Sequence, residues 1–248
     1  MRRVKDFLKT SYFELKNDFN KIKIEKLEMH KNFSWIMILS SFLFYQIQFY
    51  CFVSINNFFL NTLKMPLYVY YIFLDILTLI IVVFSFKDEL KSAFVNFKKY
   101  FKEYLKYFFY TFIIFAFLNF LVLTLCNLIV GEQSNNQTAI ESLNYVYTIF
   151  SCLVCAPIVE ELIYRGFFRK IIKNDKLFIL ISGFIFGLAH VIGSKSLIQY
   201  IYIIDYSLCG MYLANLYSKY NNIYLNILAH FIFNFMGVSG ILLRLLLF

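Results

Sequence analysis

The stretch SLNYVYTIFSCLVCAPIVEELIYRGFF, residues 142–168, decides the fold of this chain. It is predominantly apolar over the length that an α-helix, rising about 1.5 Å per residue, needs to cross a hydrocarbon core of roughly 30 Å. Near its end it carries two adjacent carboxylates, Glu160 and Glu161. The stretch therefore predicts a transmembrane helix with a polar site inside it.

The rest of the chain has the same apolar character. Its 248 residues are 60% hydrophobic, 21% aromatic and only 16% charged, which is unlike an average soluble domain. Backbone inside lipid must satisfy its own hydrogen bonds, so we predict an all-α, polytopic transmembrane helical bundle of about seven to eight spans. The predicted spans are 34–60, 66–86, 108–130, 142–168, 177–193, 197–217 and 222–236, with the apolar tail to Phe248 as the eighth candidate.

Basic segments suggest how the chain is organised around the membrane. We divide it into a basic cytoplasmic or interfacial segment, 1–33, and a transmembrane domain, 34–248, whose catalytic core is at about 142–236. Segment 87–106 places six lysines among aromatic residues, which predicts an interfacial helix. An even number of predicted spans separates the three basic stretches, 1–33, 87–106 and 165–176, so all three can lie on the same side of the membrane. The positive-inside rule then predicts a multi-pass cell-membrane protein with a cytoplasmic N-terminus.

The net charge of +9 does not indicate nucleic acid binding, because the Lys and Arg residues lie beside the spans rather than in an aromatic-lined groove. The expected partners are the lipid bilayer and a membrane-associated peptide or protein. The five cysteines all lie in apolar segments and indicate no disulfide framework.

The two adjacent glutamates have different predicted roles. Neighbouring helical positions point about 100° apart, so the two carboxylates cannot both face one cleft. Glu161 and Arg165 are four residues apart, which predicts a supporting ion pair and leaves Glu160 to face a site. Asp75 and Asp205 each occur alone in a span, and we interpret them as helix-packing contacts.

Two further motifs supply polar side chains to the same region. Glu160 and His190 are equally distant in sequence from a turn predicted at 174–175, so an antiparallel helix pair would bring them to the same depth. His230 and Asn234 are four residues apart and share one helical face. We therefore predict that an acid, two imidazoles and an amide meet.

This set of side chains can activate a water molecule and stabilise an oxyanion. In this hypothesis Glu160 is the general base, His190 assists it, and His230 and Asn234 donate hydrogen bonds to the oxyanion. No metal and no cofactor are expected. The alternative is that both histidines are packing residues and that the glutamates belong to a structural ion-pair network.

Three complete motifs give the sequence a family resemblance over about residues 142–236. They are Glu-Glu-x-x-x-Arg at 160–165, Phe-x-x-x-His at 186–190 and His-x-x-x-Asn at 230–234. The pattern resembles the CAAX protease and bacteriocin-processing (Abi) family of intramembrane glutamate endopeptidases. The resemblance implies a glutamate-activated water without metal, with Glu160 and His190 as the catalytic pair, His230 and Asn234 as the oxyanion site, and Glu161 and Arg165 in support.

The resemblance also implies a kind of substrate. The eukaryotic branch of this family removes the last three residues of prenylated CAAX proteins, and bacterial branches are linked to bacteriocin immunity and peptide-pheromone processing. Heavy use of Ile, Lys, Asn, Phe and Tyr indicates an AT-rich, bacterial genome and hence an unprenylated substrate. The predicted function is hydrolysis of a peptide bond in a membrane-associated protein or peptide.

Other chemistries compete with this interpretation. A zinc protease typically shows His-Glu-x-x-His, which is absent, although two histidines and a glutamate can still bind a metal. Gly237-Val-Ser239-Gly240 is similar to a rhomboid serine-protease motif in which Ser239 would pair with His230, but it lies at a predicted helix end. Cys152 and Cys155 fit packing better than a redox pair.

A non-catalytic membrane scaffold or bacteriocin-immunity protein of the same fold is the alternative from a different class. Such a protein would tolerate Glu160→Gln and His190→Ala without loss of function, whereas a protease would not.

Overall fold

The computed structural model describes residue 39, residue 64 and residues 66–247, which are helical with short connections and contain no strand. The predicted segment 1–33 and nearly all of the predicted span 34–60 lie outside the described residues. The helices, in chain order, are α4 (Leu67–Ser85), α5 (Lys87–Lys99), α6 (Phe101–Val130), α7 (Asn135–Glu141), α8 (Tyr145–Phe150), η1 (Ser151–Cys155), α9 (Ala156–Glu160), η2 (Glu161–Phe167), α10 (Phe168–Ile171), α11 (Asp175–Val191), η3 (Leu197–Tyr202), α12 (Ile203–Tyr220) and α13 (Ile223–Leu247).

The described helices include segments that can cross a membrane, and the all-α transmembrane prediction is confirmed. Helix α11, which corresponds to the predicted span 177–193, has only 17 residues and is shorter than each of the five segments that follow. Five helical segments of the described chain are long and apolar enough: Leu67–Ser85, Phe101–Val130, Tyr145–Ile171, Leu197–Tyr220 and Ile223–Gly240.

Two predicted boundaries differ from the structure. The span predicted at 108–130 begins earlier, because α6 starts at Phe101 directly after the break at Tyr100 and takes over the end of the predicted interfacial helix. The apolar tail does not form a separate eighth helix, because α13 continues without interruption to Leu247. No Gly or Pro with a helix-ending conformation interrupts α13, and apolar residues continue the helix.

Polar caps and left-handed residues end the helices where the sequence turns. Asn174 accepts a hydrogen bond from the Leu177 backbone N–H (3.1 Å) and caps α11, so the turn predicted at 174–175 is confirmed. Asn221, with φ 47°, ends α12 in the left-handed conformation that asparagine tolerates. These caps fix the antiparallel approach of the site-bearing helices.

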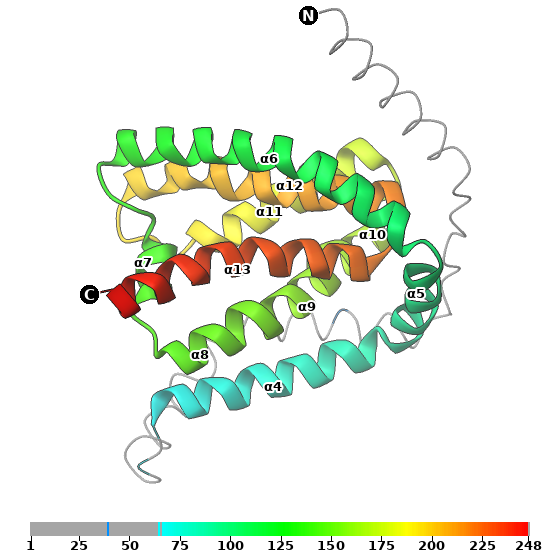
Figure 1. Cartoon of the computed structure of the whole chain (residues 1–248), viewed down its shortest axis with the longest axis horizontal. Coiled ribbons are helices and arrows are strands. Elements are labelled where there is room, and N and C mark those ends of the chain that lie inside the picture. The colour runs from blue at the N-terminus through cyan, green and yellow to red at the C-terminus, as the bar shows by residue number, and fades with distance from the viewer. Residues whose placement is uncertain (1–38, 40–63, 65, 248) are drawn as a thin grey trace, which may run out of the picture.

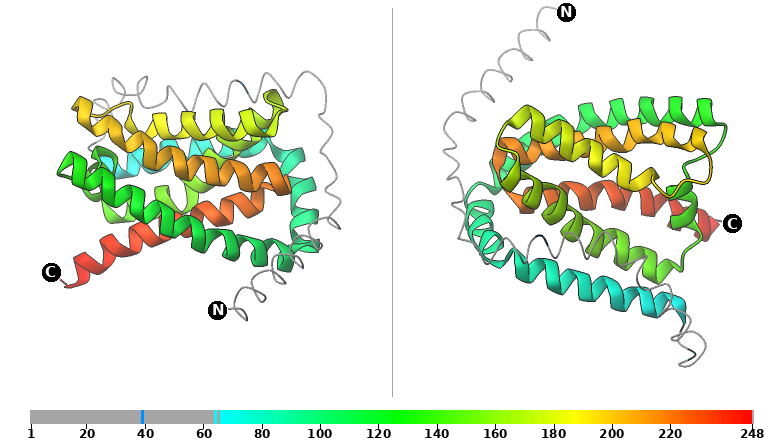
Figure 2. Two further views of the ribbon diagram at one scale, coloured as in Figure 1. Left: turned by 90° about the horizontal axis from the view of Figure 1, so that it is seen from above. Right: turned by 180° about the vertical axis from the view of Figure 1, so that it is seen from behind.

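The long helices run along one common direction, and α5 crosses one end of the bundle (Figure 1 and Figure 2). Helix α10 lies at that same end, where Lys170 forms an ion pair with Glu89 of α5. Helix α7 lies at the opposite end. The two described basic stretches thus share one side of the bundle, as their positions relative to the predicted spans require.

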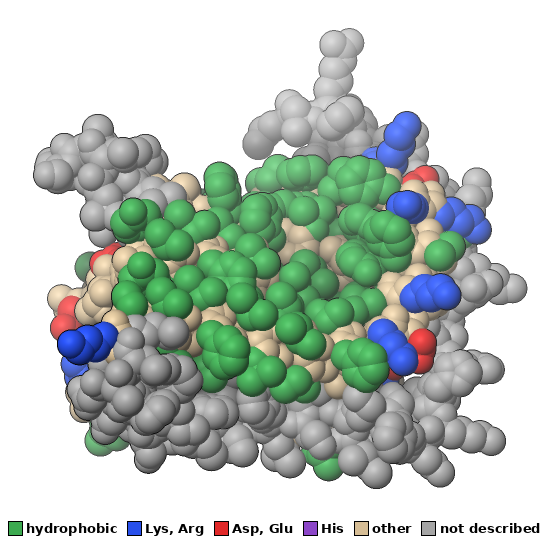
Figure 3. Space-filling view, turned by 90° about the horizontal axis from the view of Figure 1, so that it is seen from below, with side chains coloured by type: hydrophobic (Ala, Val, Ile, Leu, Met, Phe, Trp, Pro, Cys, Tyr) green, Lys and Arg blue, Asp and Glu red, His purple; other side chains and the backbone are tan. Residues whose placement is uncertain are grey.

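One face of the molecule shows this polarity directly. Hydrophobic side chains cover the middle of the visible face, and Lys, Arg, Asp and Glu side chains gather at its two ends (Figure 3). On α6 large apolar side chains such as Phe117, Phe120 and Leu128 are exposed. A bilayer accounts for this arrangement, because lipid is the solvent that suits an apolar belt between polar ends.

Helices α11 and α12 pack so closely that glycine is required between them. A Cβ atom added at Gly187 would lie 2.7 Å from the backbone nitrogen of Ser207, and one added at Gly183 would lie 2.7 Å from the backbone nitrogen of Met211. A Cβ atom added at Gly210 of α12 would likewise lie 2.7 Å from the carbonyl oxygen of Gly183. This small-residue contact is typical of transmembrane helix pairs.

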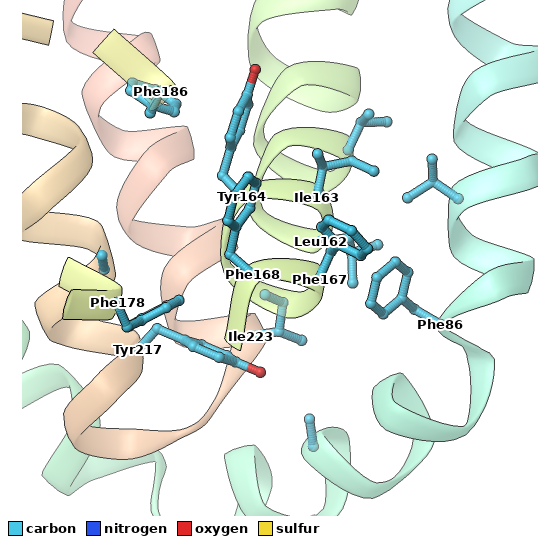
Figure 4. Close-up of a cluster of buried hydrophobic side chains, with 14 residues drawn as sticks. Phe86, Leu162, Ile163, Tyr164, Phe167, Phe168, Phe178, Phe186, Tyr217 and Ile223 are labelled. Carbon is cyan, nitrogen blue, oxygen red and sulfur yellow. The ribbon is translucent and has the colours of Figure 1, made fainter. Parts of the chain in front are cut away.

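The helix with both glutamates is the centre of the main hydrophobic core. Its residues 162–168 are fully or nearly fully buried. Leu162 and Phe167 lie toward Phe86 on one side, and Phe168 lies toward Phe178 on the other (Figure 4). Because this helix packs on several sides, its polar side chains are held within the protein and not in lipid.

Candidate active site

The helix that carries Glu160 and Glu161 is not a regular α-helix. It is continuous from Tyr145 to Ile171 but includes the π-helical segments η1 and η2. Glu160 is the last residue of α9 and Glu161 the first of η2. Widened π turns alter the direction of side chains and are frequent at functional sites. The two carboxylates lie at such a junction.

Glu161 is the hub of a fully buried network. Its Oε1 accepts a hydrogen bond from Arg165 Nη1 at 2.9 Å, so the structure contains the predicted ion pair, and both side chains are 0% exposed. Its Oε2 accepts one from Asn226 Nδ2 at 3.0 Å. Arg165 also donates to the Gly210 carbonyl oxygen at 3.0 Å. Three helices are thereby joined around one charge pair.

Arg165 therefore differs from its neighbours in the basic stretch 165–176. It is fully buried and bonded to Glu161, and its guanidinium carbon lies 4.7 Å from the centre of the Phe186 ring. Its charge belongs to the site rather than to the basic end of the bundle. Arg165 therefore does not support the predicted membrane orientation, to which the basic stretch 165–176 contributed. Arg169 and Lys170 of α10 still lie at the basic end of the bundle.

His230 connects the two glutamates. Its Nδ1 lies 2.8 Å from Glu161 Oε1 and its Nε2 lies 4.0 Å from Glu160 Oε2. Since a carboxylate paired with Arg165 can only accept, the proton of this hydrogen bond belongs to Nδ1. Glu161 thus fixes the ring so that Nε2 is the atom presented to Glu160.

Glu160 and His190 line one cavity of about 270 Å³. The prediction that helix pairing brings them to the same depth agrees with this placement. His190 Nδ1 donates to the Phe186 carbonyl oxygen at 2.8 Å, which leaves Nε2 as the basic nitrogen. The cavity is lined by Asp75, Thr78, Asn136, Ser151, Cys155, Ala156, Val159, Glu160, Tyr164, Ala189 and His190.

Tyr206 holds the His190 ring from the other side. The two rings are stacked, with centroids 4.8 Å apart and an interplanar angle of 24°. The Tyr206 hydroxyl is hydrogen-bonded to Ser134 at 2.8 Å, and Asn136 donates to it at 3.3 Å. The imidazole is thereby fixed by a network that reaches the cap of α7.

Asn234 lies beyond His230 along α13 and is not among the cavity-lining residues. Its amide Nδ2 donates to the Cys152 carbonyl oxygen at 2.7 Å. An NH₂ group has a second N–H, so this bond uses only part of its donating capacity. His230 is likewise absent from the lining residues, although its Nε2 lies 4.0 Å from Glu160 Oε2.

Sequence reasoning missed Asn226, and a signal for it was present. Asn226, His230 and Asn234 follow one another at four-residue spacing along α13, and Asn222, which caps the start of this helix, precedes them at the same spacing. This spacing places them on one helical face. The motif His-x-x-x-Asn is therefore the end of a longer polar stripe.

The two isolated aspartates have different surroundings. Asp205 accepts a hydrogen bond from Asn119 Nδ2 at 2.7 Å and joins α12 to α6, as expected of a packing contact. Asp75 of α4 has Ser151 and Tyr147 of the neighbouring helix within hydrogen-bonding reach, as expected of a packing contact, and it also lines the cavity with Glu160. A single acid in an apolar span gives no sequence signal of what lies opposite it.

The competing chemistries can be compared with the geometry. Ser239 lies inside α13 and not at a helix end, and its hydroxyl donates to the Met236 carbonyl oxygen. It is nine residues beyond His230 on the same helix, a rise of about 13.5 Å, which separates the two side chains. Within the described residues no group of three or more His, Cys, Asp or Glu side chains is placed to hold a metal ion.

The fold and this buried site define a multi-pass helical membrane protein with a carboxylate–histidine centre. Residues 142–236 match the model of the type II CAAX prenyl endopeptidase Rce1-like family, so this part of the chain is similar to CAAX proteases. The matched segment has the limits over which the three motifs indicated the resemblance, which is confirmed.

A curated relative is also similar to the chain. The UPF0177 protein YvdC of Lactococcus lactis subsp. lactis (strain IL1403) is 29% identical over 142 residues, which are 52% of this chain and 53% of the relative. The chain thus spans about half the length of that relative. No solved structure matches.

Proposed function

We propose that this protein is an intramembrane endopeptidase that hydrolyses a peptide bond of a membrane-associated protein or peptide through a glutamate-activated water. The observation that carries the proposal is the contact of His230 with both Glu160 and Glu161, beside a cavity that Glu160 and His190 line. The match of residues 142–236 to a family of CAAX proteases supports it.

The proposed reaction begins at Glu160. Its carboxylate takes a proton from water as the water oxygen attacks the carbonyl carbon of the substrate, and His190 orients that water. The carbonyl oxygen becomes an oxyanion, to which His230 Nε2–H and the second N–H of Asn234 donate. The carbon–nitrogen bond then breaks, and the departing amine receives the proton from Glu160.

The contacts around His230 add a condition to this scheme. Because Nδ1 is engaged by Glu161, His230 can donate only through Nε2, which requires the imidazolium form. In that form Nδ1–H donates to Glu161, and Nε2–H is on the side of the ring nearest to Glu160. Glu161 thus serves the reaction through His230 while it also holds Arg165.

We further propose that the protein lies in the cell membrane with its N-terminus in the cytoplasm. The basic residues of α5 and α10 share one end of the bundle, and the positive-inside rule assigns that end to the cytoplasm. The substrate is then a membrane-associated peptide, with peptide-pheromone or bacteriocin processing as the expected role.

Cleavage by purified protein in proteoliposomes tests this function. A pool of membrane-anchored peptides is incubated with wild-type protein, Glu160→Gln and His190→Ala, and the products are identified by mass spectrometry. We expect cleavage by the wild type and loss of cleavage in both variants, with normal folding confirmed by circular dichroism. A scaffold or immunity protein would instead keep its cellular function in both variants, and this result would overturn the proposal.

A further inference from the structure

A second acid lines the cavity together with Glu160. Asp75 comes from α4, whereas Glu160 comes from α9, and both line the same space of about 270 Å³. The two carboxylates are close enough to repel each other. No Lys or Arg is among the residues that line this cavity.

The Asp75 carboxyl group is only partly satisfied by its own surroundings. The side chain is only 7% exposed, and its buried Oδ2 atom has no hydrogen-bond partner among the described residues. Ser151 and Tyr147 lie within hydrogen-bonding reach of the same carboxyl group. An acid in a membrane-embedded cavity is costly unless something compensates its charge.

The fully buried cation near this site is committed elsewhere. Arg165 is bonded to Glu161 and to the Gly210 carbonyl oxygen and does not line the cavity. No Lys or Arg lines the space that Glu160 and Asp75 share, and the imidazolium that the proposed reaction places at His230 lies beside Glu160 but is not among the lining residues. A ligand that brings a positive charge gains from both carboxylates, whereas an anionic ligand is repelled.

We propose that the cavity binds a cationic group of the peptide substrate and that Asp75 is the residue that selects it. This inference rests on the proposed peptidase function, for which it names the substrate class: peptides with a Lys or Arg side chain, or a free amino terminus, near the cleaved bond. Thr78, one turn from Asp75 on α4, also lines the cavity and provides a hydroxyl at the same wall.

Binding of synthetic peptides tests the inference without requiring cleavage. Short Ala-Leu peptides, anchored through a C-terminal alkyl amide and carrying a fluorophore, are added to the full-length protein in nanodiscs. One set carries a single Lys scanned along the chain, a matched set carries norleucine, and each is made with a free or an acetylated amino terminus. Fluorescence anisotropy gives the affinities, and the cleavage rates of the same peptides are then compared.

We expect the wild-type protein to bind one kind of cationic peptide about tenfold more tightly than its neutral counterpart, either Lys over norleucine or a free over an acetylated amino terminus. Preference for Lys over norleucine identifies a side-chain cation, and preference for the free over the acetylated terminus identifies the amino group. In Asp75→Asn the preference should fall to about threefold or less. Equal binding of cationic and neutral peptides by the wild type would overturn the inference.

Asp205→Asn is the matched control, because it also removes a buried acid from a membrane span but lies outside the cavity. It should keep the preference for the cationic peptide. Thr78→Lys places a cation inside the cavity and should abolish the preference, which provides a second test if Asp75→Asn does not fold. If Asp75→Asn slows cleavage of neutral and cationic peptides equally, Asp75 serves the chemistry and not selection.

These outcomes separate the two proposals. If Glu160→Gln cleaves as fast as the wild type, the proposed function fails whatever the peptides bind. If Glu160→Gln is inactive and the wild type shows no preference for a cation, only the role of Asp75 fails.

Discussion

His230 Nδ1 lies 2.8 Å from Glu161 Oε1, so the glutamate that forms the structural ion pair also orients the histidine nearest to Glu160. Support and chemistry are therefore not cleanly divided between the two adjacent acids. Glu161 carries three partners, Arg165, Asn226 and His230, and each of them is buried. The predictions below separate what each acid does.

Glu160→Gln should lower the rate of peptide cleavage by about 100-fold or more, because the amide cannot take a proton from water. Its neutral side chain has the same shape and should leave the midpoint of thermal unfolding in detergent nearly unchanged. Cleavage rates and unfolding curves of the purified variant check both parts. Wild-type rates in a folded Glu160→Gln protein would contradict the assignment of the base.

Glu161→Gln should destabilise the fold as well as slow cleavage. It leaves Arg165 buried without its counter-charge, a change that typically costs about 3–5 kcal/mol. A lower unfolding midpoint is the expected measurement. In a double-mutant cycle, Glu161→Gln with Arg165→Met should be less unstable than the sum of the single variants. Additive losses would mean that the pair is not coupled.

Asn226→Ala should reduce both stability and activity although the residue is outside the recognised motif. Its amide donates to Glu161 Oε2 and to the Leu213 carbonyl oxygen at 2.7 Å, and buried acceptors left unpaired cost about 1–3 kcal/mol. Thermal unfolding and cleavage rates measure the two effects. Asn135→Ala, at the start of α7 and far from Glu161 along the bundle, serves as the comparison; equal effects of the two changes would refute the role of Asn226.

Gly187→Ala should loosen the contact between α11 and α12, since the added Cβ would meet Ser207 backbone at 2.7 Å. Overpacking of this kind costs about 1–3 kcal/mol, and the shift also displaces His190 three residues later. Gly193→Ala is the matched control, because nothing lies within 4 Å of its added Cβ. Unfolding midpoints should fall for the first variant only, and a tolerated Gly187→Ala would contradict the close approach.

The sequence was sufficient for much of the fold because apolar length and helix caps are local properties. Asn174 and Asn221 mark turns that depend on their own backbone, and these were predictable from neighbouring residues. The early start of α6 was not, because the break at Tyr100 involves no Gly or Pro. Periodicity alone does not distinguish an interfacial helix from the first turns of a span.

At the site, residue spacing predicted which side chains share a face of one helix, but it predicted only some of the contacts between different helices. Four-residue spacing found the pair of Glu161 and Arg165 and the shared face of His230 and Asn234. It did not show that His230 bonds to Glu161, because that contact joins residues 69 positions apart. The place of Asp75 in the cavity was not predicted for the same reason, since residues that line one cavity from different helices leave no trace in the local sequence.

The three donors to Glu161 all come from residues 142–236, whereas Asp75 and Thr78 come from α4, before that segment begins. The cavity is therefore lined partly by the matched segment and partly by residues that precede it, which are Asp75, Thr78 and Asn136. Substitutions in α4 can alter one wall without disturbing the hydrogen bonds that hold the glutamates. An engineer who wishes to redirect this protein to another peptide has a natural starting point in that helix.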